Sequence, residues 1–552
     1  MGVLNIGLSG LNAAQAGLIT TSHNIANAGN AAYTRQRTIQ EAQEPFFSGG
    51  GFLGTGAKLT TTVRQYDQFV NKQLLEAKTR SSELETYETQ IGQLDDLLAD
   101  PEAGLSPALQ GFFRAVQDLS ANPTSSAARQ STISAGEALA SRFQLLDGRM
   151  SEIRSDINAQ IGGQVQGINA CARSIADINL RIQSAETAGE SQPANDLRDQ
   201  RDQLISELND IVKVNTVMQS DGAISVFVGN GLSLVVGNQP FQLAAIPDPA
   251  DAQRTTVGQV LAGGGTSVVP ESMLSGGKLS GLLAFRSQTL DTAQSALGQL
   301  AMDFVSGFNA QHQLGQTLDG NPGGDFFGFN GTPTALTAAG MVSVTLANTR
   351  DVAAASPVAT ATGAANTGTA AIDSSRVINR TSLPFAGNVT LTFDGATNSF
   401  SASGGITAGP FAYAAGQPFT VGGVELTLTG TPANGDTFTL GNNPTGRNDN
   451  RNALLLGGVQ TASLALGGTA NFQSAYASLV ADVGSNAREV QITSRAATTL
   501  VEQTTATQQG ISGVNLDEEA ANLLRYQQHY QASSKVIQIA GKIFDEILAL
   551  GR

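Results

Sequence analysis

The last forty residues of the chain carry a large apolar side chain at every seventh position. These residues are Leu516, Leu523, Tyr530, Ile537 and Phe544. The intervening seam positions are small or polar and end in a leucine: Ala520, Gln527, Ser534, Gly541 and Leu548. A repeat of this period and length predicts one long helix with an apolar seam for a partner helix. Asn515 and the acidic residues 517–519 mark where that helix begins, because they suit an N-cap and a first turn.

The first residues of the chain have the same spacing. The apolar positions are Leu4, Leu8, Leu11, Leu18 and Ile25. They predict a helix over residues 3–28 that pairs with the last helix, so that the two chain ends lie together. Gly7, Gly10 and Gly17 each cost such a helix about 0.5–1 kcal/mol relative to alanine, so it should depend on packing. Ordinary amphipathic packing, or chance in a sequence rich in alanine and leucine, would give a similar pattern.

Between the two ends, helical and β patterns alternate in blocks. Helices are expected over residues 67–100, 106–120, 124–188, 195–211, 281–315, 448–456 and 471–509. The apolar period changes to two at residue 212, which indicates β regions over about 212–275 and 331–446. Residues 37–65 predict an extended hairpin with Gly49, Gly50 and Gly51 in its middle. We therefore predict a mainly α protein with inserted all-β domains.

This pattern predicts terminal coiled-coil helices, a bundle or rod of long helices, and two β-rich outer domains. The terminal part would comprise residues 1–66 and 510–552. The long-helix domain would comprise residues 67–211, 281–330 and 447–509. A small β domain would fill residues 212–280, and an outer β domain would fill residues 331–446.

Composition and charge exclude several classes of protein. The net charge is −15 and only 14% of residues are charged, so nucleic acid is not an expected partner. No apolar run is long enough for a membrane span, and residues 1–34 lack the charged and apolar parts of a cleaved signal peptide. Cys171 is the only cysteine, so an intrachain disulfide is impossible, and we expect a small buried thiol.

The sequence contains little that indicates catalysis. His23, His312 and His529 lie far apart on predicted helices, where a histidine is usually a packed or surface residue. No zinc, thiol-redox or phosphate-binding motif occurs. The acidic pair Glu518–Glu519 is explained by solvation and the helix dipole, and the loop 319–325 has the wrong spacing for calcium. We therefore expect no enzyme activity, no cofactor and no metal.

Three segments carry a resemblance to a known family. Residues 8–15, the segment Asn24-Ile-Ala-Asn27 and residues 512–537 resemble the terminal motifs of bacterial flagellar rod, hook and hook-associated proteins. Tyr33-Thr-Arg35-Gln is similar to the Tyr-Ser-Arg-Gln of hook-associated members, where the hook protein usually has Phe-Lys. The family usually has Thr-Pro-Gly before this tyrosine. Residues 30–32 are Asn-Ala-Ala instead, so we expect a looser or partly helical loop.

The resemblance implies a structural subunit of the flagellum at the junction of hook and filament. Such a protein is exported without a cleaved signal peptide by the flagellar type III apparatus. It assembles into a helical ring of its own copies, between the hook protein and the second junction protein. An export chaperone is expected on the C-terminal helix, with Asn27, Tyr33, Arg35 and the two heptads serving assembly. A hook or rod subunit, a secreted adhesin with its binding activity in residues 331–446, and an enzyme grafted there are the alternatives.

Overall fold

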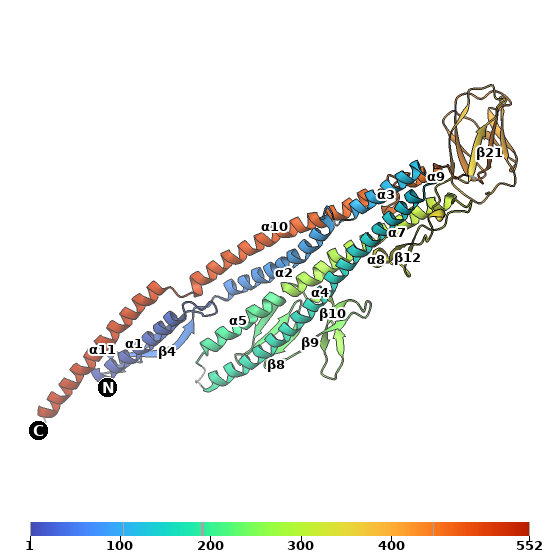
Figure 1. The fold of residues 1–552 in the computed structure, drawn as a ribbon. Coiled ribbons are helices and arrows are strands. Elements are labelled where there is room, and N and C mark those ends of the chain that lie inside the picture. Colours follow the sequence, from blue (N-terminus) through green and yellow to red (C-terminus); the bar gives the residue numbers. More distant parts are fainter. Residues whose placement is uncertain (1, 103, 189–191, 445, 551–552) are drawn as a thin grey trace. The chain divides into compact units, whose positions relative to one another are not determined.

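The computed structural model describes residues 2–102, 104–188, 192–444 and 446–550, and Figure 1 shows its fold as a ribbon. The chain divides into two compact units. Unit 1 comprises Met1–Gln90, Ser155–Phe285 and Arg488–Arg552. Unit 2 comprises Ile91–Arg154 and Arg286–Ala487. None of the described helices is long and apolar enough to cross a membrane.

These predicted helices are confirmed, with ends close to the expected residues. They are α1 (Val3–Ala26), α2 (Gln68–Ala99), α3 (Leu105–Ala121), α4 (Ser126–Ala188), α5 (Asn195–Ile211), α9 (Arg451–Gly458), α10 (Phe472–Ser512) and α11 (Leu516–Leu550). The helix expected over 281–315 differs, because it is α6 (Gly277–Ala284) and α7 (Asp291–Leu314) joined by a π-helical segment, Phe285–Leu290. It begins earlier than expected because Gly276 and Gly277 turn the chain with φ of +73° and +71°.

In unit 1, an antiparallel hairpin follows α1. Strands β1 (Gln36–Ala42) and β4 (Ala57–Arg64) pair with one bulge, and β2 (Phe46–Phe47) and β3 (Phe52–Leu53) form the outer end. The hairpin predicted over residues 37–65 is thus confirmed. Figure 1 shows β4 beside α1, and α1 along α11.

The small β region of unit 1 contains two antiparallel sheets. The first has the order β5-β6-β7-β8, with bounds Val214–Met218, Ile224–Val228, Leu232–Val236 and Gln239–Pro240. The second has the order β11-β10-β9, with bounds Thr266–Val268, Thr255–Val260 and Leu243–Pro247. Both sheets are tied to α4, since Asn179 donates to the Ile224 carbonyl and Asn169 to the Leu243 carbonyl.

The core of unit 2 is a cluster of phenylalanines. Phe112 of α3 lies edge-on to Phe304 and Phe308 of α7, with ring centroids 5.8 and 5.0 Å away. Phe326 and Phe327 complete the cluster, and all five rings are fully buried. Edge-to-face pairs add to the burial energy of such rings, so this cluster fixes how α3 and α7 pack. A short ladder of β12 (Phe327–Phe329) and β13 (Val342–Val344) borders it, beside α8 (Ala338–Met341).

The outer β part of unit 2 consists of a five-stranded and a three-stranded sheet. The larger has the order β14-β21-β16-β17-β18, with bounds Val358–Thr362, Thr437–Asn442, Val389–Asp394, Ser399–Gly404 and Ala408–Ala412. The smaller has the order β15-β20-β19, with bounds Ala371–Val377, Val424–Thr429 and Pro418–Val421. Their shared core includes Leu391, Phe400 and Leu426. The first strand pairs with the last, Val358 opposite Asn442, so this part enters and leaves its unit at one place.

The predicted surroundings of Cys171 and His312 can be compared with those in the structure. Cys171 is half-buried rather than buried, and burial raises the pKa of its thiol. His312 is fully buried, as a packed helical histidine should be. Its Nδ1 lies 2.7 Å from the Gly324 carbonyl, and its Nε2 accepts a hydrogen bond from the Ala353 amide. That acceptor role requires a neutral ring, and burial lowers the pKa of His312 to about 4.

This depressed pKa predicts an acid-sensitive core in unit 2. Between pH 6.5 and 4 the ring is protonated mainly in the unfolded chain. The contribution of the neutral ring to the free energy of unfolding is therefore complete above pH 6.5 and is lost as the pH falls. The loss at pH 5 should be about 2 kcal/mol. Urea unfolding of the wild type and of His312→Gln at pH 7.5 and pH 5 measures it. The wild type should lose more stability on acidification than the variant, and an equal loss would contradict the assignment. The exposed His529→Gln is the matched control.

Candidate assembly site at the chain ends

Helices α1 and α11 pack antiparallel through small side chains. The residues of α1 that face α11 form a small-residue seam with alternating spacings of three and four, namely Gly7, Gly10, Ala14, Gly17, Thr21 and Asn24. A Cβ added to Gly17 would lie 2.6 Å from the Tyr526 ring, and one added to Gly7 would lie 2.8 Å from Ile537. The glycines that weaken α1 as an isolated helix therefore allow α11 to approach closely.

The apolar heptad of α1 is not the contact between the two helices. We name it the leucine face: Leu4, Leu8, Leu11, Leu18 and Ile25. Leu4 and Leu8 are 46% and 47% exposed, Ile25 is 36% exposed, and the other two are partly buried. The expectation that this stripe packs on the last helix is wrong within one chain. Its seven-residue repeat runs parallel to the small-residue seam but lies on a neighbouring face of the helix.

The heptad of α11 lies on the side facing α1, but it extends past both ends of α1. Leu523 and Ile537 are partly buried against α1, and Tyr530 is exposed at the margin of the contact. Glu519 is hydrogen-bonded to Asn24 in the last turn of α1. Leu516 comes three residues before Glu519 and is 55% exposed. At the other end, Phe544 and Leu548 lie beyond the start of α1 and are 60% and 56% exposed.

A polar node of Asn24, Tyr33, Arg35 and Glu519 fixes the register of the pair. The side-chain amide nitrogen of Asn24 donates to Glu519 Oε2 at 3.0 Å and to the Gln36 carbonyl at 2.9 Å. Its oxygen accepts from the Gln36 amide at 3.0 Å and from the Tyr33 hydroxyl at 2.7 Å. Asn24 is fully buried with these bonds made, so the node tolerates only one alignment of its parts.

Arg35 joins the end of α10 to the start of α11. Its backbone amide donates to the Ser512 carbonyl at 2.9 Å, and its Nε donates to Glu519 Oε1 at 2.8 Å. A second nitrogen lies 2.6 Å from Glu518. Burial alone would lower the pKa of Arg35, but Glu518 and Glu519 raise it above its usual value. The interpretation of Glu518–Glu519 as solvated acids is therefore wrong for Glu519, which is 2% exposed.

The node is anchored to α5 by a second set of carboxylates. Asp199 accepts from the Thr34 amide at 3.1 Å and from Arg64 at 2.7 Å. His23 lies 3.2 Å from Asp196 at the start of α5. Burial, and then the carboxylates around it, raise the pKa of Tyr33 above its usual range. The Tyr33 hydroxyl therefore keeps its proton and donates to Asn24.

The loop between α1 and β1 is a tight turn without proline or glycine at residues 30–32. The Tyr33 amide donates to the Asn30 carbonyl at 3.0 Å, and the Ala32 amide donates to the Asn30 side chain at 3.1 Å. The expectation of a looser or partly helical loop is wrong, because the asparagine side chain closes the turn itself. Asn27 completes the end of α1 by donating to the His23 carbonyl at 3.0 Å.

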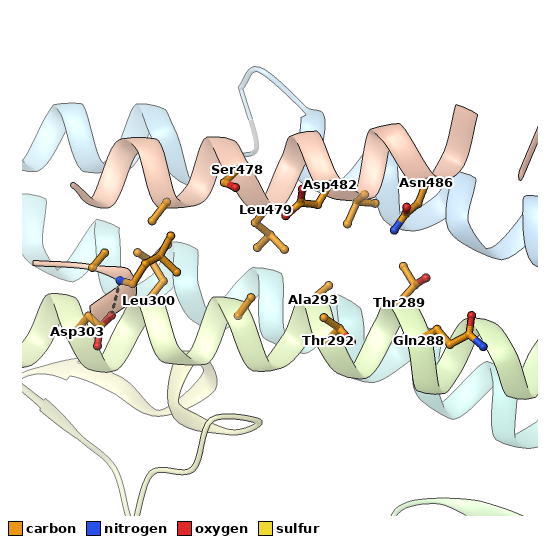
Figure 2. Close-up of a pocket in the computed structure, with 15 residues that line it drawn as sticks. Gln288, Thr289, Thr292, Ala293, Leu300, Asp303, Ser478, Leu479, Asp482 and Asn486 are labelled. Carbon is orange, nitrogen blue, oxygen red and sulfur yellow. Dashed lines mark hydrogen bonds between the residues drawn. The ribbon is translucent and has the colours of Figure 1, made fainter. Parts of the chain in front are cut away.

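Other places in the described residues offer less chemistry. A groove of about 140 Å³ lies in unit 2. Figure 2 shows Ala293 and Leu300 of α7 opposite Leu479 of α10 in this groove. The Leu466 amide donates to Asp303 at its margin. Its lining is mainly small and apolar, and no group of three or more His, Cys, Asp or Glu in the described part of the chain could hold a metal.

Comparisons with known proteins place the chain in a family. Residues 91–327 match the flagellar hook-associated protein FlgK helical domain, and residues 509–550 match the flagellar basal body rod FlgEFG protein C-terminal family. The chain is 37% identical to flagellar hook-associated protein 1 of Escherichia coli over 99% of both chains. It is 24% identical to that of Bacillus subtilis, over 98% of this chain and 96% of the relative.

A solved structure shows the same fold. The flagellar hook junction protein FlgK from Burkholderia pseudomallei is 31% identical, with a TM-score of 0.71 over 80% of this chain and all of the other. The paired terminal helices and these relatives define a structural subunit of the bacterial flagellum. Within that class, the chain belongs to the family of flagellar hook-associated protein 1, FlgK.

The small-residue seam predicts opposite effects for two glycines of the same helix pair. Gly17→Ala should weaken the pair by about 1–3 kcal/mol, because the new methyl group collides with Tyr526. Gly541→Ala has open space around its Cβ and should stabilise α11 by about 0.5–1 kcal/mol. Hydrogen exchange of the α1 and α11 amides measures both changes. If Gly17→Ala slows exchange in α1, the close-approach role of Gly17 is wrong.

The polar node predicts unequal roles for two adjacent glutamates. Glu519→Gln should cost about 1.5–3 kcal/mol in the docking of α11, because it leaves buried hydrogen-bond donors without their charged acceptor. Glu518→Gln is the matched control: this side chain is 58% exposed, so its loss should cost less than about 1 kcal/mol. The measurement is the opening free energy of the first α11 turns by hydrogen exchange. Equal effects would refute the buried role of Glu519.

Proposed function

We propose that this chain joins hook to filament through contacts of its paired terminal helices with other subunits. One observation supports this proposal above all. Small residues of α1 close the pair, while large apolar residues of both helices, among them Leu8 and Phe544, stay exposed. A single chain leaves Leu4, Leu8, Phe544 and Leu548 in water, although each such residue contributes about 1.5–3 kcal/mol when fully buried. Neighbouring subunits provide that burial.

The proposed assembly is a helical ring of copies with the terminal helices as its inner layer. The hook protein lies on one side and the second hook–filament junction protein on the other. The role is structural and involves no catalysis, cofactor, nucleic acid or membrane.

Before assembly, the exposed apolar positions of α11 need a cover. We propose that a flagellar export chaperone binds α11, and that the chain leaves the cell through the flagellar type III apparatus. The support is the apolar C-terminal end, where Ile543, Phe544, Ile547 and Leu548 are each about half exposed or more. A solvent-exposed apolar stripe of this kind favours aggregation or binding.

The rival roles draw less support. The relatives that span the full length of the chain are hook-associated proteins, which disfavours a rod or hook subunit. An adhesin or an enzyme in the outer β part would need a binding surface there. Its described residues instead place their aromatic rings, such as Phe393 and Phe400, in the core between the two sheets.

Two deletions test the proposed function in the flagellated cell. Removing residues 516–552 should abolish filament attachment and swimming, because it removes α11 and the acceptors of the polar node. Replacing residues 358–442 by a short glycine-serine linker should leave both largely intact, because Val358 and Asn442 are paired neighbours. Electron microscopy and swimming assays measure the outcome. Filament growth after the terminal deletion would show that the junction role is wrong.

A further inference from the structure

The end of the β1–β4 hairpin exposes large apolar side chains that have no role in the function proposed above. This hairpin tip consists of Phe46, Phe47, Phe52 and Leu53, which are 43%, 63%, 74% and 53% exposed. Phe47 and Phe52 contact each other edge-on across the ladder, with centroids 5.5 Å apart. Residues 45–57 contain no charged side chain. Such a projection is costly in water unless another surface covers it.

Hydrogen bonds attach the part of the hairpin next to the tip to α1. The Ala57 amide donates to Ser9 Oγ at 3.2 Å, and the Gln40 side chain donates to the Ala13 carbonyl at 3.3 Å. A Cβ on Gly56 would lie 3.5 Å from the Ile6 Cα. The hairpin thus occupies the face of α1 that carries Ile6, Ser9 and Ala13.

Helix α1 therefore has three faces with different neighbours. The small-residue seam faces α11, and the face of Ile6 and Ser9 holds the hairpin. The leucine face is only partly covered by the described residues, since Leu4 and Leu8 stay nearly half exposed. At 100° per residue it lies about 170° around the helix from the hairpin. A chain consequently cannot place its own tip on its own leucine face.

We infer that the hairpin tip of one copy packs on the leucine face of α1 in a second copy of this chain. The two surfaces suit each other because both are apolar and uncharged. His23 is the only titratable side chain in α1, whereas α11 presents Arg525, Lys535 and Lys542 among its exposed residues. An aromatic tip without charges can therefore lie on α1 without burying an unpaired charge. On α11 the same tip would have to bury or displace these charged side chains.

The arrangement has a consequence for symmetry and strength. Tip and leucine face are different surfaces on nearly opposite sides of one helix, so each copy offers one of each and the contact propagates from copy to copy. The three phenylalanines expose roughly 350 Å². That is less than half of the ~800 Å² per partner of a standard interface, so the contact should form in the assembled ring and not between dilute monomers. This inference rests on the proposed function and names one of its contacts.

Cysteine pairs test the contact in assembled flagella. In a Cys171→Ser parent, Phe52→Cys is combined in turn with Leu4→Cys, Leu8→Cys, Leu11→Cys and Leu18→Cys, since the position of the tip along the helix is not specified. After mild oxidation, at least one pair should give a ladder of disulfide-linked multimers, and the single-cysteine chains should not. Phe69→Cys with the same partners is the matched control, because Phe69 is 76% exposed and lies outside the tip. No ladder from any pair, or equal ladders from the Phe69 pairs, would overturn the inference.

A second variant measures whether assembly needs the tip. Phe47→Ser with Phe52→Ser should lower the fraction of cells that retain filaments by about tenfold or more, whereas Phe69→Ser should leave it unchanged. Hydrogen exchange should show α1 and α11 equally protected in both variants, which separates lost docking from lost folding. Normal filament retention in the double variant would overturn the inference and leave the proposed function standing. A failure of the proposed function itself would be seen in a different experiment, as filament growth after removal of residues 516–552.

Discussion

The close antiparallel approach of α1 and α11 is the constraint on which the chain ends depend. Two helices can come this near only where one of them presents almost no side chain. Gly7, Gly10 and Gly17 supply that face, and Tyr526 and Ile537 fill the space above them. The cost is an α1 helix of low intrinsic stability, which the contact with α11 offsets. Because the small residues take the inner face, the leucines are left on an outer one.

The polar node adds alignment to this close contact. Apolar and small surfaces slide easily past one another, but Asn24 can satisfy its four hydrogen bonds in one position only. Burying the Glu519 carboxylate is expensive, and the Arg35 guanidinium offsets that cost without a large net gain. The node is therefore better understood as the device that selects one register than as a main source of stability. Through Arg35 it also fixes where α11 starts relative to the end of α10.

The outer β part and the chain ends are independent in their construction. The two sheets from β14 to β21 have their own core, and they connect to the helical part of unit 2 where β14 and β21 pair. A β part attached in this way can change without disturbing the phenylalanine cluster around Phe112 and Phe304. The assembly surfaces described above all lie in unit 1, on α1, α11 and the hairpin.

The sequence by itself determined the helices, the larger strands, the pairing of the chain ends and the family. These features depend on local periods and on motifs that are short in sequence. It did not determine which face of α1 meets α11. Two stripes with the same seven-residue period lie side by side on this helix, and hydrophobicity alone favours Leu4 and Leu8 over Gly7 and Gly10. Steric fit against Tyr526 and Ile537 decides the other way, and that fit exists only in three dimensions. The burial of Glu519 is of the same kind, since its partner Arg35 lies 484 residues away along the chain.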